Sequence, residues 1–338
     1  MLEEYKNQIQ ERAKSGLPPL PLSAEQTAGL IGLIKSPGST DVDYLLDMLI
    51  NRVPAGVDQA AFVKAAFLND IALEKISSPF ITSAKAIELL GTMLGGYNVQ
   101  ALVDLLKTDK ADAAVKALSK ITLIFDAFYD VEELHLAGNT FATQLIQSWA
   151  DADWFNQKNN SPKFIEAIVF RADGEINTDD LSPAQEAWSR ADIPLHAKSM
   201  LQNKTPEAID IISKLKSQGL PLVFVGDIVG TGSSRKSAIN SLQWHMGNPI
   251  PFIPNKHSGG IILGNKIAPI FFNTAEDSGA LPIECDVSSF KMGDKIKIDL
   301  ESQSILRNES RVCNFHLSPT TLLDELRAGG RIPLIIGR

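Results

Sequence analysis

The hydrophobic pattern of this 338-residue chain changes near residue 160, and this change constrains the fold more than any other feature. Before that point, apolar residues such as Leu45, Met48 and Leu49 recur at the spacing of amphipathic helices. After residue 162, short runs of β type alternate with helix candidates, which is typical of a sheet packed against helices. The sequence therefore predicts a multidomain protein, with an all-α domain at residues 1–160 and an α/β domain at residues 161–338.

Signals for helix ends divide the first domain into about seven to ten short helices. Ser23 and Gln26 form a capping-box pattern, and Thr82 and Asp41 are candidate caps of two further helices. Breaks rich in Pro and Gly separate the helices at residues 36–38, 53–56, 78–79 and 95–96. Such helices bury their apolar sides by stacking on neighbours, so we expect an irregular HEAT-like solenoid of antiparallel pairs.

The second domain follows a polar linker at residues 159–162. Its candidate strands are residues 164–170, 222–225, 261–263, 281–285 and 295–300. One helix is predicted from a Thr205 cap to Gly219, and a second from Ser318 to Gly329. These elements predict an α/β or mixed β/α arrangement.

Composition excludes several classes of protein. Lys and Arg number 32 against 40 Asp and Glu, a net charge of −8, which is the wrong sign for a generic nucleic-acid binder. No apolar run approaches the roughly 18 residues of a membrane helix, and the acidic start is unlike a secretory signal. The two cysteines, Cys285 and Cys313, are too few for a disulfide framework or an iron–sulfur cluster. We therefore expect a cytosolic protein without membrane contact and without a metal site of its own.

The segment from Leu222 to Ala238 carries the sharpest chemical signal. A buried strand runs into the loop Gly230-Thr231-Gly232-Ser233-Ser234-Arg235 and then into a helix. Glycines let the backbone approach a ligand, free amides at the helix start attract anions, and Arg235 can grip a carboxylate or phosphate. The spacing matches neither a P-loop nor a dinucleotide fingerprint. The pattern is thus that of a non-nucleotide anion site, or alternatively of a capped turn with a surface arginine.

This loop resembles the substrate-binding loop in the swivelling domain of the aconitases. Residues 177–183 resemble the motif that opens this domain, and residues 187–194 the stretch that carries a second substrate-binding arginine. The arrangement of a HEAT-like domain followed by a swivelling domain is similar to the start of the aconitase B family. Further segments resemble that family at residues 87–98, 267–274 and 329–335. The resemblance covers essentially the whole chain.

The resemblance implies a hydro-lyase of the tricarboxylic acid cycle that interconverts citrate and isocitrate through cis-aconitate. In this subfamily 2-methylisocitrate is expected as a further substrate. By analogy Ser233 is the general base, and Arg190, Ser233, Ser234 and Arg235 bind substrate. Asp179 is expected to orient an arginine. The histidines are scattered without ligand spacing, and the sequence assigns none of them a role.

The resemblance also implies a [4Fe-4S] cluster that acts as a Lewis acid, and two cysteines cannot hold it. The cluster is therefore expected from missing domains or from a cluster-bearing partner subunit. This chain, as an N-terminal fragment or a separate subunit, is predicted to be inactive alone.

Two other functions stay open at this stage. The helical half could serve as a protein- or RNA-interaction module, including a homodimer contact, although its 13 basic and 20 acidic residues disfavour unspecific RNA binding. The small subunit of an isopropylmalate isomerase also uses a swivelling domain without the cluster. The long helical half argues against that assignment.

Overall fold

The computed structural model describes residues 1–36, 38, 41–158 and 161–337. It divides into two compact units. Residues 1–158, the loop segment Pro251–Pro254 and the last described residues from Ile335 form the helical unit. Most of residues 161–334 form the α/β unit. Pro37 of a predicted break and Asn159 and Asn160 of the predicted linker lie outside the described residues.

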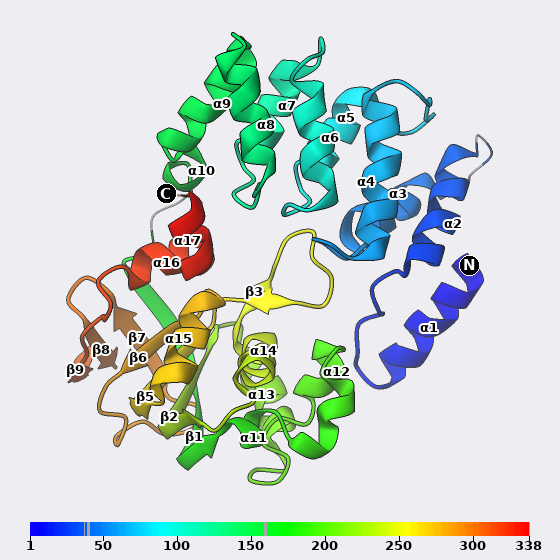
Figure 1. Ribbon diagram of the computed structural model, residues 1–338. Helices are drawn as coiled ribbons and strands as arrows, with labels where there is room; N and C mark the ends of the chain where they lie inside the picture. Colours follow the sequence, from blue (N-terminus) through cyan, green and yellow to red (C-terminus); the bar gives the residue numbers. More distant parts are fainter. Residues whose placement is uncertain (37, 39–40, 159–160, 338) are drawn as a thin grey trace. The chain divides into compact units, whose positions relative to one another are not determined.

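The main part of the helical unit contains no strand among its described residues. Its helices are α1 (Leu2–Lys14), α2 (Ala24–Lys35), α3 (Val42–Asn51), α4 (Gln59–Ala72), α5 (Ser83–Leu90), α6 (Tyr97–Leu105), α7 (Ala111–Leu118), α8 (Ala127–Leu136), α9 (Thr140–Ala150) and α10 (Asp153–Asn156). From α4 to α6, each helix contacts both the next helix and the one after it, and Figure 1 shows α4 to α9 following one another side by side. This is the contact pattern of stacked helices, with Leu49, Leu68 and Leu102 fully buried between them.

Local capping signals decided where several of these helices begin. The capping box is confirmed, because Ser23 Oγ accepts from Gln26 N at 3.1 Å while Gln26 Oε1 accepts from Ser23 N at 3.0 Å. Thr82 also caps its helix by accepting from Lys85 N at 3.2 Å. Asp41 precedes α3, but its side chain makes no capping hydrogen bond. Its backbone ψ of 59° lies outside the extended region that aims a cap side chain at the first turn.

The α/β unit is built on a mixed seven-stranded sheet in the order β6-β5-β2-β1-β7-β8-β9. Its strands are β1 (Phe164–Asn177), β2 (Leu222–Thr231), β5 (Ile261–Ile267), β6 (Leu281–Glu284), β7 (Lys295–Asp299), β8 (Ser304–Arg307) and β9 (Ser310–Asn314), with a separate pair β3 (Asn248–Pro249) and β4 (His257–Ser258). Its helices are α11 (Thr178–Leu181), η1 (Ala184–Ser189), α12 (Ile193–Ala197), α13 (Ala208–Lys216), α14 (Arg235–Met246), α15 (Pro269–Asp277), α16 (Leu322–Ala328) and α17 (Arg331–Gly337), whose last residues belong to the helical unit. Neighbours among β1, β2, β5 and β6 are parallel, whereas β7 to β9 add to β1 in antiparallel fashion.

Alternate side chains of the central strands pack into two separate hydrophobic cores, one on each face of the sheet. Phe170 and Phe224 pack with residues of α13, α14 and α15 on one face of the sheet. Val169 and Val223 pack on the other face with residues of β7, β8 and α16. This period of two is what a strand buried on both sides requires. The predicted fold class, a helical region followed by an α/β domain, is confirmed.

Several element bounds differ from the sequence prediction. Strand β2 extends to Thr231 because it pairs with β1 and β5 on both sides. Helix α13 begins at Ala208, since Ala208 N donates to Thr205 O and so closes a turn before the helix. Likewise α16 begins at Leu322, after a turn in which Leu322 N donates to Pro319 O. The elements without a predicted counterpart include strands β3, β4, β8 and β9 and helices α11, α12, α15 and α17.

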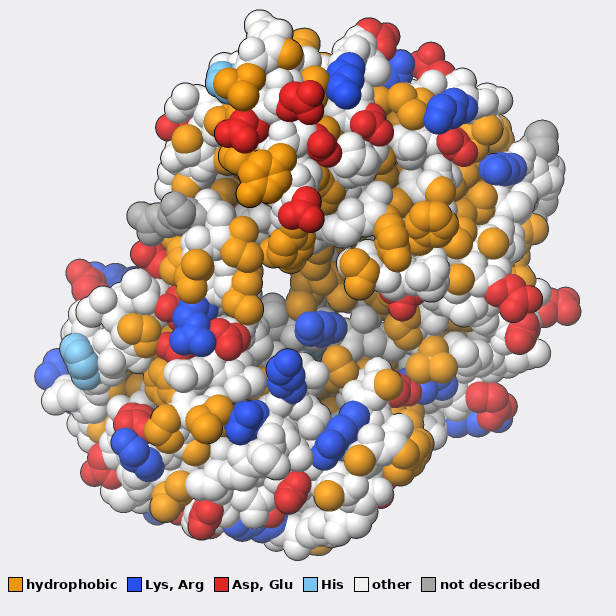
Figure 2. Space-filling view, viewed as in Figure 1, with side chains coloured by type: hydrophobic (Ala, Val, Ile, Leu, Met, Phe, Trp, Pro, Cys, Tyr) orange, Lys and Arg blue, Asp and Glu red, His pale blue; other side chains and the backbone are white. Residues whose placement is uncertain are grey.

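Exposed hydrophobic side chains are frequent on the helical unit (Figure 2), where Phe125 is 70% and Leu136 is 79% exposed. None of the helices in the described part of the chain is long and apolar enough to cross a membrane.

Candidate anion-binding site

The loop after β2 lies at the carboxyl ends of the parallel strands, where α/β sheets usually bind ligands. Gly230 and Gly232 have φ angles of +84° and +101°, which favour glycine. A Cβ on Gly230 would lie 2.2 Å from Cγ of Phe271, and one on Gly232 would lie 2.6 Å from Oγ1 of Thr178. Both glycines are therefore needed for the loop to approach α15 and α11 this closely.

Ser234 stands at the N-cap position of α14 without using its side chain as a cap. Its backbone N–H donates to Thr178 Oγ1 at 3.2 Å. The first amides of a helix have no partner within the helix, and the helix dipole makes them attractive to anions. Arg235 N donates to Ser233 O at 2.9 Å, so the next amides of the first turn, those of Lys236 and Ser237, are the ones of the kind that a carboxylate accepts from.

Arg190 reaches this loop from a segment 44 residues earlier. Its Nη2 donates to Ser234 Oγ at 3.1 Å. Its Nε is buried and has no hydrogen-bond partner in the described part of the chain. A buried donor without a partner is uncommon in folded proteins. Arg190 thus keeps hydrogen-bonding capacity beside the α14 amides.

The five predicted site residues are placed as follows. Arg190 and Ser234 are in direct contact; Ser233 is exposed in the bend, and Arg235 is half-buried as the first residue of α14. Asp179 is exposed in α11 and forms no ion pair within the described ranges. Its neighbour Asp180 has the structural role instead, because it completes a capping box with Asn177. The functional roles of all five residues stay predictions.

Sequence reasoning missed a buried cluster beside this loop. His196 is 2% exposed, and its Nε2 lies 2.7 Å from Ser182 Oγ while its Nδ1 lies 2.8 Å from Ser189 Oγ. Burial and then the charge of Arg190 lower the pKa of His196 below its ordinary value. The signal that could have found it is its position six residues after Arg190, in the stretch that carries the resemblance.

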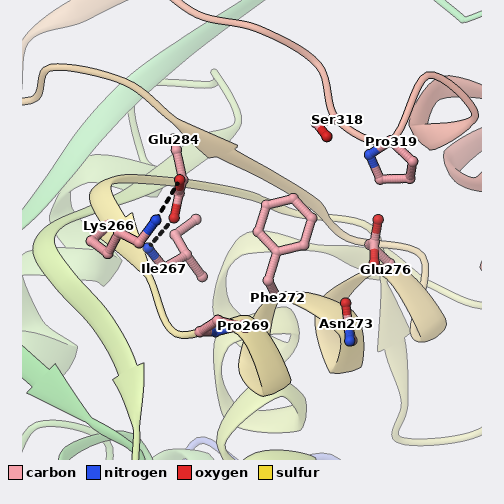
Figure 3. Close-up of a pocket in the computed structure, with 9 residues that line it drawn as sticks. All are labelled: Lys266, Ile267, Pro269, Phe272, Asn273, Glu276, Glu284, Ser318 and Pro319. Atoms are coloured by element: carbon pink, nitrogen blue, oxygen red, sulfur yellow. Dashed lines mark hydrogen bonds and ion pairs between the residues drawn. The ribbon is translucent and has the colours of Figure 1, made fainter.

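A pocket of the α/β unit lies at the ends of β5 and β6 (Figure 3). It is a pocket of about 360 Å³ whose lining includes Phe272 and Glu276 of α15 and Pro319. On one side Lys266 Nζ lies 3.2 Å from Glu284, which also accepts from Ile267 N at 2.8 Å. None of the five predicted site residues is among those that line it.

Glu276 is the chemically unusual group of this pocket. It is 2% exposed, and burial, followed by the neighbouring Glu325, raises its pKa to about 7. Its Oε2 lies 3.6 Å from Arg331 Nη1, while its Oε1 accepts no hydrogen bond from any described residue. Glu276 is therefore partly protonated near neutral pH.

The thiols of the chain do not fit a four-iron cluster. Cys285 is buried and Cys313 half-buried, and the two side chains interact with each other. Such a cluster is held by more thiolates than two cysteines provide. Within residues 1–36, 38, 41–158 and 161–337, no group of three or more His, Cys, Asp or Glu side chains is arranged to hold a metal ion.

Comparison with known proteins defines the class to which this fold and loop belong. The family model described as "Aconitate B N-terminal domain" matches residues 4–155, and the one described as "Aconitate hydratase 2 N-terminus" matches residues 167–338. Both units thus carry the features of the N-terminal region of aconitate hydratases.

Individual relatives show which aconitate hydratase family the chain belongs to. Aconitate hydratase B of Synechocystis is 54% identical over 100% of this chain and 39% of its own length. The Escherichia coli enzyme of the same name is 53% identical over 100% of this chain and 41% of its own length. The chain belongs to the aconitate hydratase B family, of which it represents the N-terminal portion, and it spans about two fifths of the length of these relatives.

A more distant relative matches the α/β part. The homoaconitase small subunit of Thermus thermophilus is 28% identical over 48% of this chain and 89% of its own length. The far higher identity to aconitate hydratase B, over the whole chain, disfavours the small-subunit assignment.

Proposed function

We propose that this chain supplies the tricarboxylate-binding half of a hydro-lyase site that interconverts citrate and isocitrate through cis-aconitate, and also takes 2-methylisocitrate. Arg190 and Arg235 bind carboxylates of the substrate, together with Ser234 and the first amides of α14. Several cations and amides directed at one region offset the charge of a tricarboxylate and fix its orientation.

Ser233 acts as the general base in this proposal. A serine hydroxyl is a weak base in water, so its alkoxide needs stabilisation by nearby positive charge. In the proposal this charge comes from the start of α14, from Arg235 in the same loop, and from Arg190, which contacts the neighbouring Ser234. Ser233 is exposed, which leaves it accessible to a substrate carbon from which it removes a proton.

A [4Fe-4S] cluster would supply Lewis-acid chemistry to the whole enzyme. The two thiols of this chain do not fit it, so other domains or a partner subunit provide it. It follows that the purified chain binds tricarboxylates weakly and does not turn them over.

The observation that carries the proposal is the contact between Arg190 Nη2 and Ser234 Oγ at 3.1 Å. It joins two segments that each carry one of the expected arginines. The buried Nε of Arg190, which has no hydrogen-bond partner among the described residues, leaves this arginine a donor for a carboxylate beside the helix start.

Titration calorimetry with citrate and with tricarballylate tests the proposal. Binding to the parent chain should be lost in Arg190→Ala and in Arg235→Ala, and weakened in Arg235→Lys because lysine cannot make two parallel hydrogen bonds. Arg311→Ala is the matched control, since Arg311 is an exposed arginine of β9 in the same unit. Equal binding by the parent chain and both alanine variants would contradict the proposal, as would cis-aconitate formation by the chain alone.

A further inference from the structure

His196 lies at the centre of a chain of hydrogen bonds that runs toward Ser234. In the α/β unit, Ser182 Oγ donates to Ser237 Oγ at 2.8 Å. Ser237 Oγ in turn donates to the carbonyl of Ser234 at 3.2 Å. A serine hydroxyl has one proton to donate. Because Ser182 uses its proton toward Ser237, it accepts from His196, and the ring proton lies on Nε2.

The other side of the ring contacts Ser189 and the backbone of Glu186. Ser189 Oγ lies 2.8 Å from His196 Nδ1 and also 2.8 Å from the carbonyl of Glu186. His196 Nδ1 also lies 3.1 Å from the carbonyl of Glu186. Nδ1, the Ser189 hydroxyl and this carbonyl thus form one contact group, which ties the ring to the residue next to Arg190. These contacts connect Ser189 through His196, Ser182 and Ser237 to Ser234.

The two ends of this chain are the residues next to the two arginines. Ser189 precedes Arg190, and Ser234 precedes Arg235. The cluster is shielded from water, with Ser182 at 0%, His196 at 2% and Ser189 at 4% exposure. Buried hydrogen bonds fix geometry tightly because breaking one leaves polar groups without partners.

We propose that His196 is a positioning residue that, through Ser182 and Ser237, holds the Arg190 segment against the start of α14 in the geometry that binds the tricarboxylate. This inference rests on the proposed function. His196 touches neither substrate nor the reacting atoms, and acts only through Arg190 and Ser234.

Two substitutions of similar polarity separate the two sides of the ring. In His196→Gln the side-chain amide reaches the position of Nε2 and can donate to Ser182. In His196→Asn the amide reaches only the position of Nδ1 and leaves Ser182 without a donor. We expect His196→Asn to weaken citrate binding about three- to tenfold, the effect of one net hydrogen bond, and His196→Gln to keep most of the affinity.

Substitutions of the serines test the same series of hydrogen bonds and disturb folding less than a change of the imidazole does. Ser182→Ala and Ser237→Ala should each weaken citrate binding to a similar extent, and combining Ser237→Ala with His196→Asn should add little further loss. Ser199→Ala is the control, because this buried serine donates to the carbonyl of His196 at 2.7 Å but takes no part in the series of hydrogen bonds from Ser189 to Ser234. Affinity unchanged in both Ser182→Ala and Ser237→Ala would overturn the inference.

Nitrogen NMR of His196 gives a readout that a purely structural role does not move. We expect a protonated Nε2, with its signal shifted by Ser237→Ala and unmoved by Ser199→Ala. An Nε2 without a proton, or an Nε2 signal indifferent to Ser237→Ala, contradicts the inference even if citrate binds. Absence of citrate binding to the parent chain contradicts the proposed function, whereas the NMR result still decides the hydrogen-bond chain.

Discussion

Arg171 and Asp227 form an ion pair between β1 and β2, with Arg171 Nη2 2.5 Å from Asp227 Oδ1. The second carboxylate oxygen of Asp227 accepts from Gly174 N at 2.6 Å. The two contacts lie at the irregularity in the pairing of β1 with β2 between Ala172 and Glu175. Asp227 therefore connects the regular part of the sheet to the strand ends that carry the candidate site.

Asp227→Ala should lower the free energy of unfolding by about 1–3 kcal/mol, because it leaves Arg171 Nη2 and Gly174 N without their acceptor while Asp173 still pairs with Arg171 Nε. Urea titration measures this. Glu301→Ala is the control, since it removes an exposed partner of Lys163 and should leave stability almost unchanged. Equal losses of unfolding free energy in the two variants would mean that the Arg171–Asp227 pair stabilises the fold no more than an exposed ion pair does.

Glu276 should make the α/β unit less stable as pH rises. Its pKa in the folded chain is raised to about 7 by burial and by Glu325, above that of an unfolded glutamate. The folded state therefore binds the proton more tightly, and this stabilisation is complete below the unfolded pKa and is lost as pH rises through about 7. Urea unfolding from about pH 5 to pH 8 should show the decline in the parent chain and a flatter profile in Glu276→Gln. Parallel profiles would contradict the assignment.

Lys64 should reduce the stability of the helical unit. It is 2% exposed, its Nζ donates to Ile50 O at 3.3 Å, and burial lowers its pKa to about 8. Lys64→Met should raise the free energy of unfolding at neutral pH by about 1–3 kcal/mol. Because the folded-state pKa is depressed, the parent chain should gain stability as pH rises above about 8, and the variant should not. A variant less stable than the parent at neutral pH would refute this.

Gly230→Ala should disrupt the loop more than an ordinary substitution of a glycine with positive φ. Its new methyl group would overlap Phe271, with the Cβ 2.2 Å from Cγ. The expected loss is about 2–5 kcal/mol from strain and overlap together. Gly219 has a φ of +80° with nothing within 4 Å, so Gly219→Ala should cost only about 1 kcal/mol. Thermal unfolding of the pair checks the difference, which should be absent if Phe271 moves aside freely.

The two thiols should differ in reactivity. The hydrogen bond between the two thiols lowers the pKa of Cys313. The same bond, followed by burial, raises the pKa of Cys285. The thiolate is the reactive form, so iodoacetamide should modify Cys313 well before Cys285, as peptide mass spectrometry would show. Cys285→Ala should slow the reaction of Cys313 by removing the hydrogen bond. Faster modification of Cys285 would contradict this ordering.

Short-range patterns were sufficient to predict much of this protein. The change from helical to β periodicity, the capping signals at Ser23 and Thr82, and the Gly230–Arg235 loop all depend on residues a few positions apart. Such signals do not predict where a strand ends, since β2 reaches Thr231 only because β1 and β5 pair with it. They also misplaced the start of α13, where a turn at Thr205 replaces the expected cap.

The sequence by itself determined the two-part fold, the family and the candidate residues of the anion site. The tertiary structure decided that Arg190 meets Ser234, that His196 joins Ser189 to Ser237 through Ser182, and that Glu276 and Arg331 come together. The physical reason is that capping and hydrophobic periodicity depend on residues close together in the sequence. The contacts named above join residues up to 55 positions apart, such as Ser182 and Ser237. They exist only after packing of the sheet and its helices has removed water and set the distances.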